Sequence, residues 1–492
     1  MILMLTERHP PRRPGLAAYA RLRGLVQPVL SSRRYLGDLS RTDCFRALGI
    51  KGKRPRGLPD PSNSRHFCFT LDKIFDYTSV PHERFCVLVS KKTNHPSGAT
   101  KRMHHTPSVE FDHPQGFLSL AKNIGIKDDT LDLAVIYSTA RARAAAMFTR
   151  NRFPGAPVIV GRKHIANGYV QALVINSKNA NVAMGKQGID NAIETCRIVG
   201  EELGVDSYDV LPFSTGVIGR PLPMEKIRAG LRGIRDELKP DNLKLAAEAI
   251  MTTDKYPKYF SCQVGPAVIA GIAKGAGMIE PNMATMLAYL MTDAELPAAS
   301  LRPMLKRVVD RTFNAMSIDT DTSTSDTVVL MANGLAGPVN RRDFEAGLLK
   351  VSDYLTRELA RSGEGATKLI TVDVDGAKNK AQAKRIAKSV VNSPLVKTAV
   401  YGCDPNWGRV IMAVGKSFDP TIEPAKVTIR FGDTDVFKKG SPVDCDLEAL
   451  RKYLAQSEVV ITVDLGIGKA SARVWGCDLT EGYIKENAYY TT

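Results

Sequence analysis

The segment that most constrains this chain is residues 274–287, KGAGMIEPNMATML, where a glycine-rich stretch runs directly into an apolar one. Gly275 and Gly277 allow backbone angles that other residues avoid, and Pro281 fixes its own φ angle. The residues that follow Thr285 are apolar and favour a buried strand. The ordinary interpretation of this pattern is a tight turn before a strand.

The bond between Ala284 and Thr285 in the same segment supports a second interpretation. A flexible backbone that enters a rigid strand can hold one peptide bond under strain. A threonine hydroxyl beside such a bond can attack the preceding carbonyl, and water then cleaves the ester. The new threonine has a free α-amine that can act as the general base for its own hydroxyl. The pattern therefore allows a self-activating nucleophile at Thr285.

Six further motifs occur in order along the chain. They are STGVIG (214–219), AIMTTD (249–254), DTDTSTSDT (319–327), GEGATKL (363–369), DPNWGR (404–409) and ENAYYTT (486–492). Together with residues 274–287 they resemble the signature segments of the ornithine acetyltransferases, which are bifunctional, self-cleaving enzymes of arginine biosynthesis. The resemblance extends from about residue 115 to the last residue.

The resemblance implies a function and a fold. The enzyme would move an acetyl group from N2-acetylornithine to glutamate through an acetyl-Thr285 intermediate, as a glutamate N-acetyltransferase. Some members also use acetyl-CoA as donor, which adds an amino-acid N-acetyltransferase activity, and we expect both. The implied fold is α/β, a layered αββα sandwich of the N-terminal-nucleophile type with a smaller second α/β domain. The C-terminal tail would return to the active site.

The resemblance also assigns the site residues. Thr285 is the nucleophile, the cleaved bond joins Ala284 to Thr285, and Thr215 with Gly216 forms the oxyanion hole. The substrate-binding residues are Thr252, Lys274, Thr285, Glu364, Asn487 and Thr492, with Thr253 as an alternative to Thr252. A lysine suits a substrate carboxylate, and a glutamate suits an ammonium. No metal and no tightly bound cofactor is expected.

The charge distribution predicts a leader. Residues 1–106 contain 20 Lys and Arg against 7 Asp and Glu, a net charge of +13, whereas the remainder contains 48 against 44, a net charge of +4. An arginine-rich, acid-poor start with interspersed leucine and alanine is typical of a mitochondrial transit peptide. The alternative is a disordered basic tail. We expect a leader over 1–60, a linker over 61–106, and location in the mitochondrial matrix.

The cleavage expectation divides the rest into an alpha chain (107–284) and a beta chain (285–492). The resemblance implies a heterotetramer of two alpha and two beta chains. The partners are otherwise small amino acids. The basic residues of the leader lack the interleaved aromatics of a nucleic-acid arm, and no run is apolar enough for a membrane helix. A basic binding protein without enzymatic activity is disfavoured, because the excess charge lies in the leader.

Cysteine and histidine usage restricts the chemistry. The eight cysteines include no CxxC pair, which argues against structural zinc and disulfides. Six of the eight histidines precede residue 107, which leaves His113 and His164 for the rest. This scarcity favours a nucleophile that needs no histidine. A self-cleaving aminopeptidase or amidohydrolase would use the same nucleophile and remains the alternative function.

Periodicity predicts helices over 140–147, 189–202, 224–238, 243–251, 301–315, 344–361 and 378–390. Strands are expected at 131–137, 171–175, 427–431, 459–463 and 472–476. The GIGKAS segment (466–471) has the wrong glycine–lysine spacing for a P-loop and predicts a hairpin turn. The acid-rich residues Asp319, Asp321 and Asp326 could form a cation site or, with the interleaved serines and threonines, equally a self-bonded turn, and we assign no metal to them.

Overall fold

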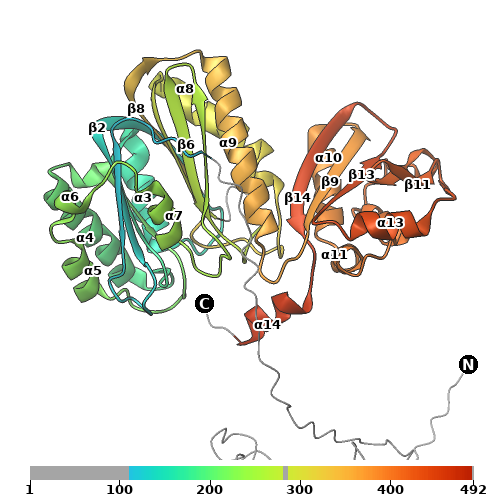
Figure 1. Cartoon of the computed structure of the whole chain (residues 1–492), viewed down its shortest axis with the longest axis horizontal. Coiled ribbons are helices and arrows are strands. Elements are labelled where there is room, and N and C mark those ends of the chain that lie inside the picture. Colours follow the sequence, from blue (N-terminus) through green and yellow to red (C-terminus); the bar gives the residue numbers. More distant parts are fainter. Residues whose placement is uncertain (1–109, 281–285, 490–492) are drawn as a thin grey trace, which may run out of the picture. The chain divides into compact units, whose positions relative to one another are not determined.

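The computed structural model describes residues 110–280 and 286–489. The predicted leader and linker, the Ala284–Thr285 bond and Thr492 lie outside the described residues. Within the described part, no helix is long and apolar enough to span a bilayer. The strands of the described residues form one eight-stranded and one six-stranded sheet, and helices accompany both (Figure 1).

The larger sheet has the order β4-β3-β2-β8-β7-β6-β5, and β1 also pairs with β2. Its strands are β1 (Phe117–Lys122), β2 (Leu133–Phe148), β3 (Tyr169–Asn176), β4 (Val210–Ser214), β5 (Lys258–Val264), β6 (Ala267–Lys274), β7 (Leu287–Glu295) and β8 (Thr327–Pro338). The β3–β4 and β7–β8 pairs are parallel, and the other pairs are antiparallel.

Strand β2 joins the two halves of this sheet. Its first part pairs with β1 and β3 and its second part with β8, with a register shift between Tyr137 and Ala142. The predicted helix over 140–147 is therefore wrong. Ala144 faces one apolar cluster and Ala145 the opposite one, which is the alternation of a strand buried on both faces. The high helix propensity of alanine is outweighed by sheet pairing and burial.

The two halves of the sheet stack as the inner layers of a sandwich. Between them, Phe213 of β4 meets Tyr289 of β7 edge to face, with ring centroids 5.0 Å apart. Outside one half pack α3 (Ala156–His164), α4 (Gly185–Leu203) and α5 (Met224–Leu231), and outside the other pack α8 (Ala298–Arg311) and α9 (Arg341–Arg361). This αββα order confirms the expected fold class (Figure 1).

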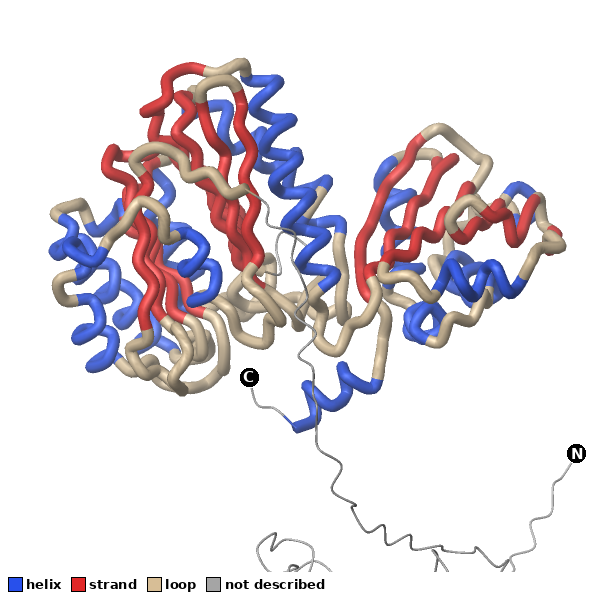
Figure 2. Tube along the Cα trace, viewed as in Figure 1, coloured by secondary structure: helices blue, strands red, loops and turns tan. Residues whose placement is uncertain are grey.

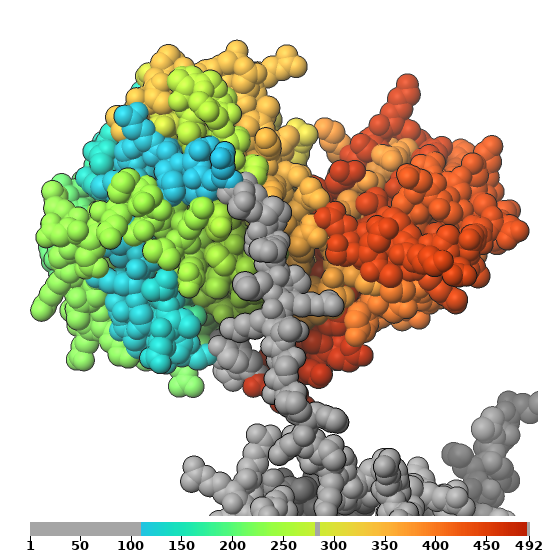
Figure 3. All heavy atoms as spheres, in the orientation of Figure 1, coloured from blue at the N-terminus to red at the C-terminus, as the bar shows by residue number. Residues whose placement is uncertain are grey.

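Distant parts of the sequence lie side by side on this body. The Asp112 N–H donates to Ser261 Oγ (2.8 Å), and β1 packs against α7 (Leu243–Ala249). Figure 3 shows the same relation, with the blue atoms of the first described residues beside green atoms of residues near 250.

The predicted helix over 224–238 is two helices, α5 and α6 (Ile234–Glu237), because Gly233 between them has a φ of +69°.

The second domain is a smaller α/β unit with its own apolar core. Its sheet has the order β12-β11-β10-β13-β9-β14. The strands are β9 (Leu369–Ala377), β10 (Thr428–Phe431), β11 (Thr434–Lys438), β12 (Ser441–Pro442), β13 (Glu458–Asp464) and β14 (Ala470–Cys477). The helices are α10 (Lys380–Val391), α11 (Pro394–Tyr401), α12 (Trp407–Gly415) and α13 (Leu447–Leu454).

The predicted hairpin turn at 466–471 is also wrong. Strands β13 and β14 do not pair with each other, because both pair with β9 from opposite sides. The GIGKAS segment instead crosses the end of β9. A Cβ on Gly468 would lie 2.1 Å from the Ala377 carbonyl oxygen, so its glycine permits this close crossing. The other predicted helices and strands are confirmed within a few residues.

Candidate active site

A polar pocket lies where several strands of the larger sheet end. The loops after β4 and β6, the start of β7, and the loop before β8 all reach this point, as Figure 2 shows by the gathering of loops beneath the strands. The loops after β3, α7 and α9 and the C-terminal helix α14 (Glu481–Tyr489) contribute the remaining wall. The pocket has a cavity volume of about 120 Å³ and is partly open to solvent.

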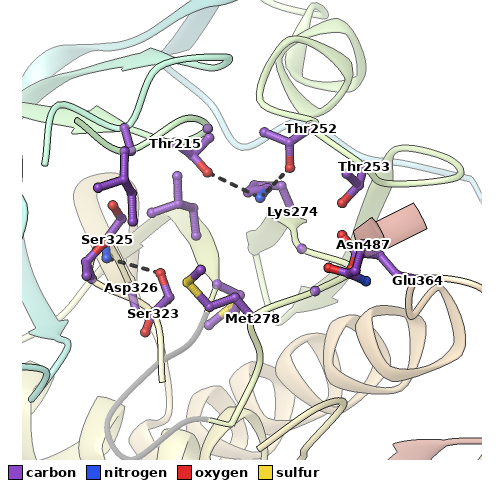
Figure 4. Close-up of a pocket in the computed structure, with 18 residues that line it drawn as sticks. Thr215, Thr252, Thr253, Lys274, Met278, Ser323, Ser325, Asp326, Glu364 and Asn487 are labelled. Carbon is purple, nitrogen blue, oxygen red and sulfur yellow. Dashed lines mark hydrogen bonds between the residues drawn. The ribbon is translucent and has the colours of Figure 1, made fainter. Parts of the chain in front are cut away.

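Most of the predicted site residues line this pocket. They are Thr215, Gly216, Thr252, Lys274, Glu364 and Asn487. Figure 4 shows Lys274 between Thr215 and Thr252, with Glu364 and Asn487 to one side and Ser323, Ser325 and Asp326 to the other. These residues come from segments that are far apart in the sequence, so the fold brings them together.

Thr215 and Gly216 form the turn after β4. The Thr215 N–H donates to the Asn176 carbonyl (3.0 Å), so the hydroxyl is the donor that Thr215 has left for a ligand. Gly216 has a φ of +129°, and a Cβ there would lie 2.3 Å from the Lys178 carbonyl carbon. Glycine is therefore required for this close turn. The turn has the two donor types that an oxyanion hole needs, a backbone amide and a hydroxyl.

Lys274 ends β6 and is buried. Its Nζ donates to Thr252 Oγ1 (2.9 Å) and to Thr215 Oγ1 (3.3 Å). An ammonium has no acceptor, so both hydroxyls accept from the lysine and their own protons point elsewhere. The Thr215 proton is thereby available to an oxyanion. Burial lowers the pKa of Lys274, and the Asp254 carboxylate opposes this effect.

Thr252 and Thr253 both line the pocket. Of the two, Thr252 accepts the hydrogen bond from Lys274, and its own N–H donates to Asp254 Oδ2 (3.1 Å). The geometry therefore supports Thr252, in preference to Thr253, as the residue that works beside Lys274.

Glu364 and Asn487 meet on the opposite side of the pocket from the Ser323–Asp326 loop. Asn487 Nδ2 donates to Glu364 Oε2 (2.8 Å), and the Glu364 N–H donates to the Ala276 carbonyl (2.8 Å). The C-terminal helix thus reaches the pocket through Asn487. Glu364 is only 7% exposed, so its carboxylate is well placed to attract an ammonium from a ligand.

Thr285 and Ala284 lie outside the described residues, but both flanks of their segment are placed. Leu287 pairs with Lys274 on one side and Thr327 on the other, and the Thr327 N–H donates to the Met286 carbonyl (2.9 Å). Met286 and Leu287 line the pocket. The chain therefore enters β7 at the pocket, two residues after the predicted nucleophile.

The upstream flank is bonded to the second domain. Glu280 Oε2 accepts from Ser317 Oγ (2.7 Å) and from Asn392 Nδ2 (2.5 Å), and Glu280 Oε1 lies 3.8 Å from Lys388 Nζ on α10. Burial lowers the pKa of Lys388 to about 8, although Glu280 opposes that effect. Lys388 of α10, Asn392 just after it and Ser317 thus contact the residue directly before Pro281.

Of the two interpretations of the acid-rich segment, the contacts of Asp319 support the turn. The Asp319 carboxylate accepts from the backbone N–H groups of Met278 (2.6 Å), Ile279 (2.7 Å) and Asp321 (3.3 Å). It therefore braces the glycine-rich loop. Among the described residues, no group of three or more His, Cys, Asp or Glu side chains is arranged to hold a metal ion.

Sequence reasoning missed two carboxylates near Lys274. The sequence suggests a turn or a cation site for Asp326, whereas the structure buries it in the wall of the pocket. Asp254 was not considered, although it closes the AIMTTD motif beside Thr252. Its position next to a predicted ligand was the signal that could have identified it.

The fold and the pocket define an αββα α/β protein with a polar pocket where the chain enters a central strand. The sequence model of the ArgJ family matches residues 119–492. The chain therefore belongs to the ArgJ family.

Named relatives are similar over most of their length. Arginine biosynthesis bifunctional protein ArgJ 2 of Nostoc sp. is 50% identical over 380 residues, which cover 77% of this chain and 98% of the relative. Glutamate N-acetyltransferase Oat2 of Streptomyces clavuligerus is 50% identical over 385 residues, with the same shares of the two chains.

Two solved structures are also similar. A crystal structure of Arginine biosynthesis bifunctional protein argJ from Bacillus halodurans is 40% identical, with a TM-score of 0.41, over 42% of this chain and 100% of that chain. Ornithine acetyltransferase from Mycobacterium tuberculosis, complexed with ornithine, is 33% identical, with a TM-score of 0.31, over 34% of this chain and 93% of that chain.

Proposed function

We propose that this protein is an acetyltransferase of arginine biosynthesis that moves an acetyl group from N2-acetylornithine to glutamate. Membership of the ArgJ family and the printed names of its relatives support the reaction. The observation that carries the assignment to this pocket is the Lys274 ammonium, which donates to Thr215 and Thr252 beside the start of β7.

The reaction has two half-reactions at Thr285. The Thr285 hydroxyl attacks the acetyl carbon while its α-amine takes the proton. The oxyanion accepts hydrogen bonds from the Thr215 hydroxyl and the Gly216 N–H, and the C–N bond breaks as the departing ornithine nitrogen takes the proton back. The glutamate amine then attacks acetyl-Thr285. N-acetylglutamate leaves, and the threonine hydroxyl is restored.

The two charged residues bind different groups of the substrates. Lys274 faces the carboxylate that N2-acetylornithine and glutamate share, and Glu364 faces the amino-bearing end of ornithine. Thr252, Asn487 and Thr492 supply further hydrogen bonds. Acetyl-CoA serves as a second acetyl donor without a tightly bound cofactor, as the bifunctional names of the relatives suggest.

The nucleophile arises by self-cleavage between Ala284 and Thr285. The products are an alpha chain that ends at Ala284 and a beta chain that begins at Thr285, and two copies of each assemble as a heterotetramer. The basic start of the chain directs the enzyme to the mitochondrial matrix. The matched relatives named above are bacterial, so this targeting rests on the leader's charge alone.

Intact mass spectrometry and an acetyl-transfer assay on the same sample test the mechanism. The wild-type protein should give two associated chains, the second starting at Thr285, and should form N-acetylglutamate from N2-acetylornithine and glutamate. Thr285→Ala should remain one chain without transfer activity. An uncleaved wild-type protein with full activity would refute the mechanism, and release of free acetate at the rate of ornithine formation would support a hydrolase instead.

A further inference from the structure

A buried ion pair lies directly behind the proposed substrate-binding lysine. Asp254 follows the Thr252–Thr253 pair after α7, and Lys258 begins β5. Asp254 Oδ1 is 2.6 Å from Lys258 Nζ, and both side chains have 0% exposure. Neither residue lines the pocket, so neither has a part in the mechanism above.

The Asp254 carboxylate also holds the two segments that carry proposed ligands. Its Oδ1 accepts from the Gly275 N–H (2.6 Å), which is the residue after Lys274, and its Oδ2 accepts from the Thr252 N–H (3.1 Å). Gly275 has a φ of +148°, so a glycine allows the chain to turn towards the carboxylate at this point. The Asp254 side chain therefore fixes the backbone at both residues that the Lys274–Thr252 hydrogen bond joins.

The charged side chains that act on Lys274 come from four separate segments. Asp254 follows α7, Lys258 lies on β5, Asp326 precedes β8, and Glu364 follows α9. Burial alone would raise the pKa of the Asp254 carboxyl, but Lys258 and Lys274 hold it well below its ordinary value. For Lys274, burial lowers the pKa, Asp254 raises it and Lys258 lowers it. The two members of the pair thus act on Lys274 with opposite sign.

We propose that Asp254 is a positioning residue that keeps Lys274 charged and directed at the Thr215 and Thr252 hydroxyls, and that Lys258 holds the Asp254 carboxylate in place. The proposal rests on the proposed function and extends it. A buried ion pair is expensive to desolvate and often adds no stability over an apolar pair, so stability is a weak reason for it. Here the pair sets the charge of the group that orients the oxyanion donor Thr215.

The test compares Asp254→Asn with Lys258→Met, because the proposal predicts effects of opposite sign on the same group. The pH profile of kcat/KM for acetyl transfer should fall at alkaline pH as Lys274 loses its proton. In Asp254→Asn the ammonium loses a neighbouring negative charge, so this fall should move to lower pH by about one unit. In Lys258→Met the ammonium loses a neighbouring positive charge, so the fall should move to higher pH.

Two further samples exclude a purely structural effect. The double variant Asp254→Asn/Lys258→Met removes both charges of the pair, so it leaves no unpaired buried charge that could unfold the protein. Its pH profile should lie between the profiles of the two single variants. Asp373→Asn breaks a paired carboxylate in the second domain, where Arg473 contacts it (2.7 Å), and should leave the profile unchanged. A general loss of folding would lower the rate at every pH without moving the profile.

Binding of L-ornithine, measured by calorimetry across the same pH range, provides a readout that does not need turnover. Affinity should weaken at the pH where each variant loses transfer. If the wild-type protein shows no acetyl transfer, the proposed function is refuted, whatever the variants do. An active wild-type enzyme whose two single variants shift the profile in the same direction, or not at all, would overturn the positioning role of the pair.

Discussion

The Glu364 carboxylate lies over the backbone of Gly277 at a distance that a side chain would prevent. A Cβ on Gly277 would be 2.3 Å from Glu364 Oε2 and 2.4 Å from its Cδ. Gly277 is not among the glycines with positive φ, so available space and not backbone angle is what requires glycine here. The glycine-rich loop is therefore shaped around a charged residue of the pocket.

Gly277→Ala should displace this carboxylate and break its contact with Asn487. A hydrogen bond to a charged group contributes about 1.5–3 kcal/mol, so kcat/KM for N2-acetylornithine should fall about tenfold or more. Steady-state kinetics measure the effect. Gly415→Ala at the end of α12 is the matched control, because a Cβ there meets no atom within 4 Å. Wild-type kinetics in Gly277→Ala would show that the position of Glu364 does not matter for turnover.

Helix α14 is joined to the loop after α9 by polar contacts. No residue of this helix is buried. Glu486 Oε1 accepts from the Gly365 N–H (3.2 Å), and Thr480 Oγ1, just before the helix, donates to the Gly365 carbonyl (2.7 Å). Gly365 has a φ of +67°, and a Cβ there would lie 2.1 Å from the Tyr483 nitrogen. A single glycine thus allows the C-terminal helix to approach.

Gly365→Ala should release α14 and remove Asn487 from the pocket. We expect faster amide hydrogen exchange over residues 481–489 and a loss of acetyl transfer, with self-cleavage preserved. Gly265→Ala, in the turn between β5 and β6, is the control, because it adds comparable strain at a φ of +58° but meets no atom within 4 Å. If the variant transfers acetyl at the full rate while the amide hydrogens of α14 exchange rapidly, this helix has no role in substrate binding.

At the scale of the whole molecule, charge and family membership divide the chain at nearly the same place. The family match begins at residue 119, and residues 1–106 carry a net charge of +13 against +4 for the rest. Residues 119–492, which the family model matches, contain 48 Lys and Arg against 42 Asp and Glu, so this part carries less than half of the excess positive charge. Most of the excess positive charge lies before it, as in a targeting segment.

Deletion of residues 1–60 should leave acetyl transfer by the purified enzyme unchanged and abolish import into isolated mitochondria. Residues 1–60 fused to a reporter should be imported, because an arginine-rich amphipathic leader is sufficient for targeting. A fusion whose arginines in this segment are replaced by glutamine is the control and should stay outside. Loss of transfer activity in the soluble truncated enzyme would instead mean that the segment belongs to the fold.

The sequence by itself determined the features that depend on neighbouring residues. Apolar periodicity identified most helices, such as α9, because burial of one helix face requires that spacing. The glycines of residues 274–287 marked the loop before β7. Ordered motifs identified Thr215, Lys274 and Glu364, which the structure places around one pocket, while Thr285 remains a prediction outside the described residues.

Only the tertiary structure decided the features that depend on partners distant in sequence. Residues 140–147 are a strand because β8 and two apolar clusters surround them, which no local propensity can report. Thr252 differs from its neighbour Thr253 because its hydroxyl meets Lys274, on a strand 22 residues further along. The proposed role of Asp254 also depends on the tertiary structure, because the charge of the buried Lys274 depends on which carboxylate the fold brings beside it.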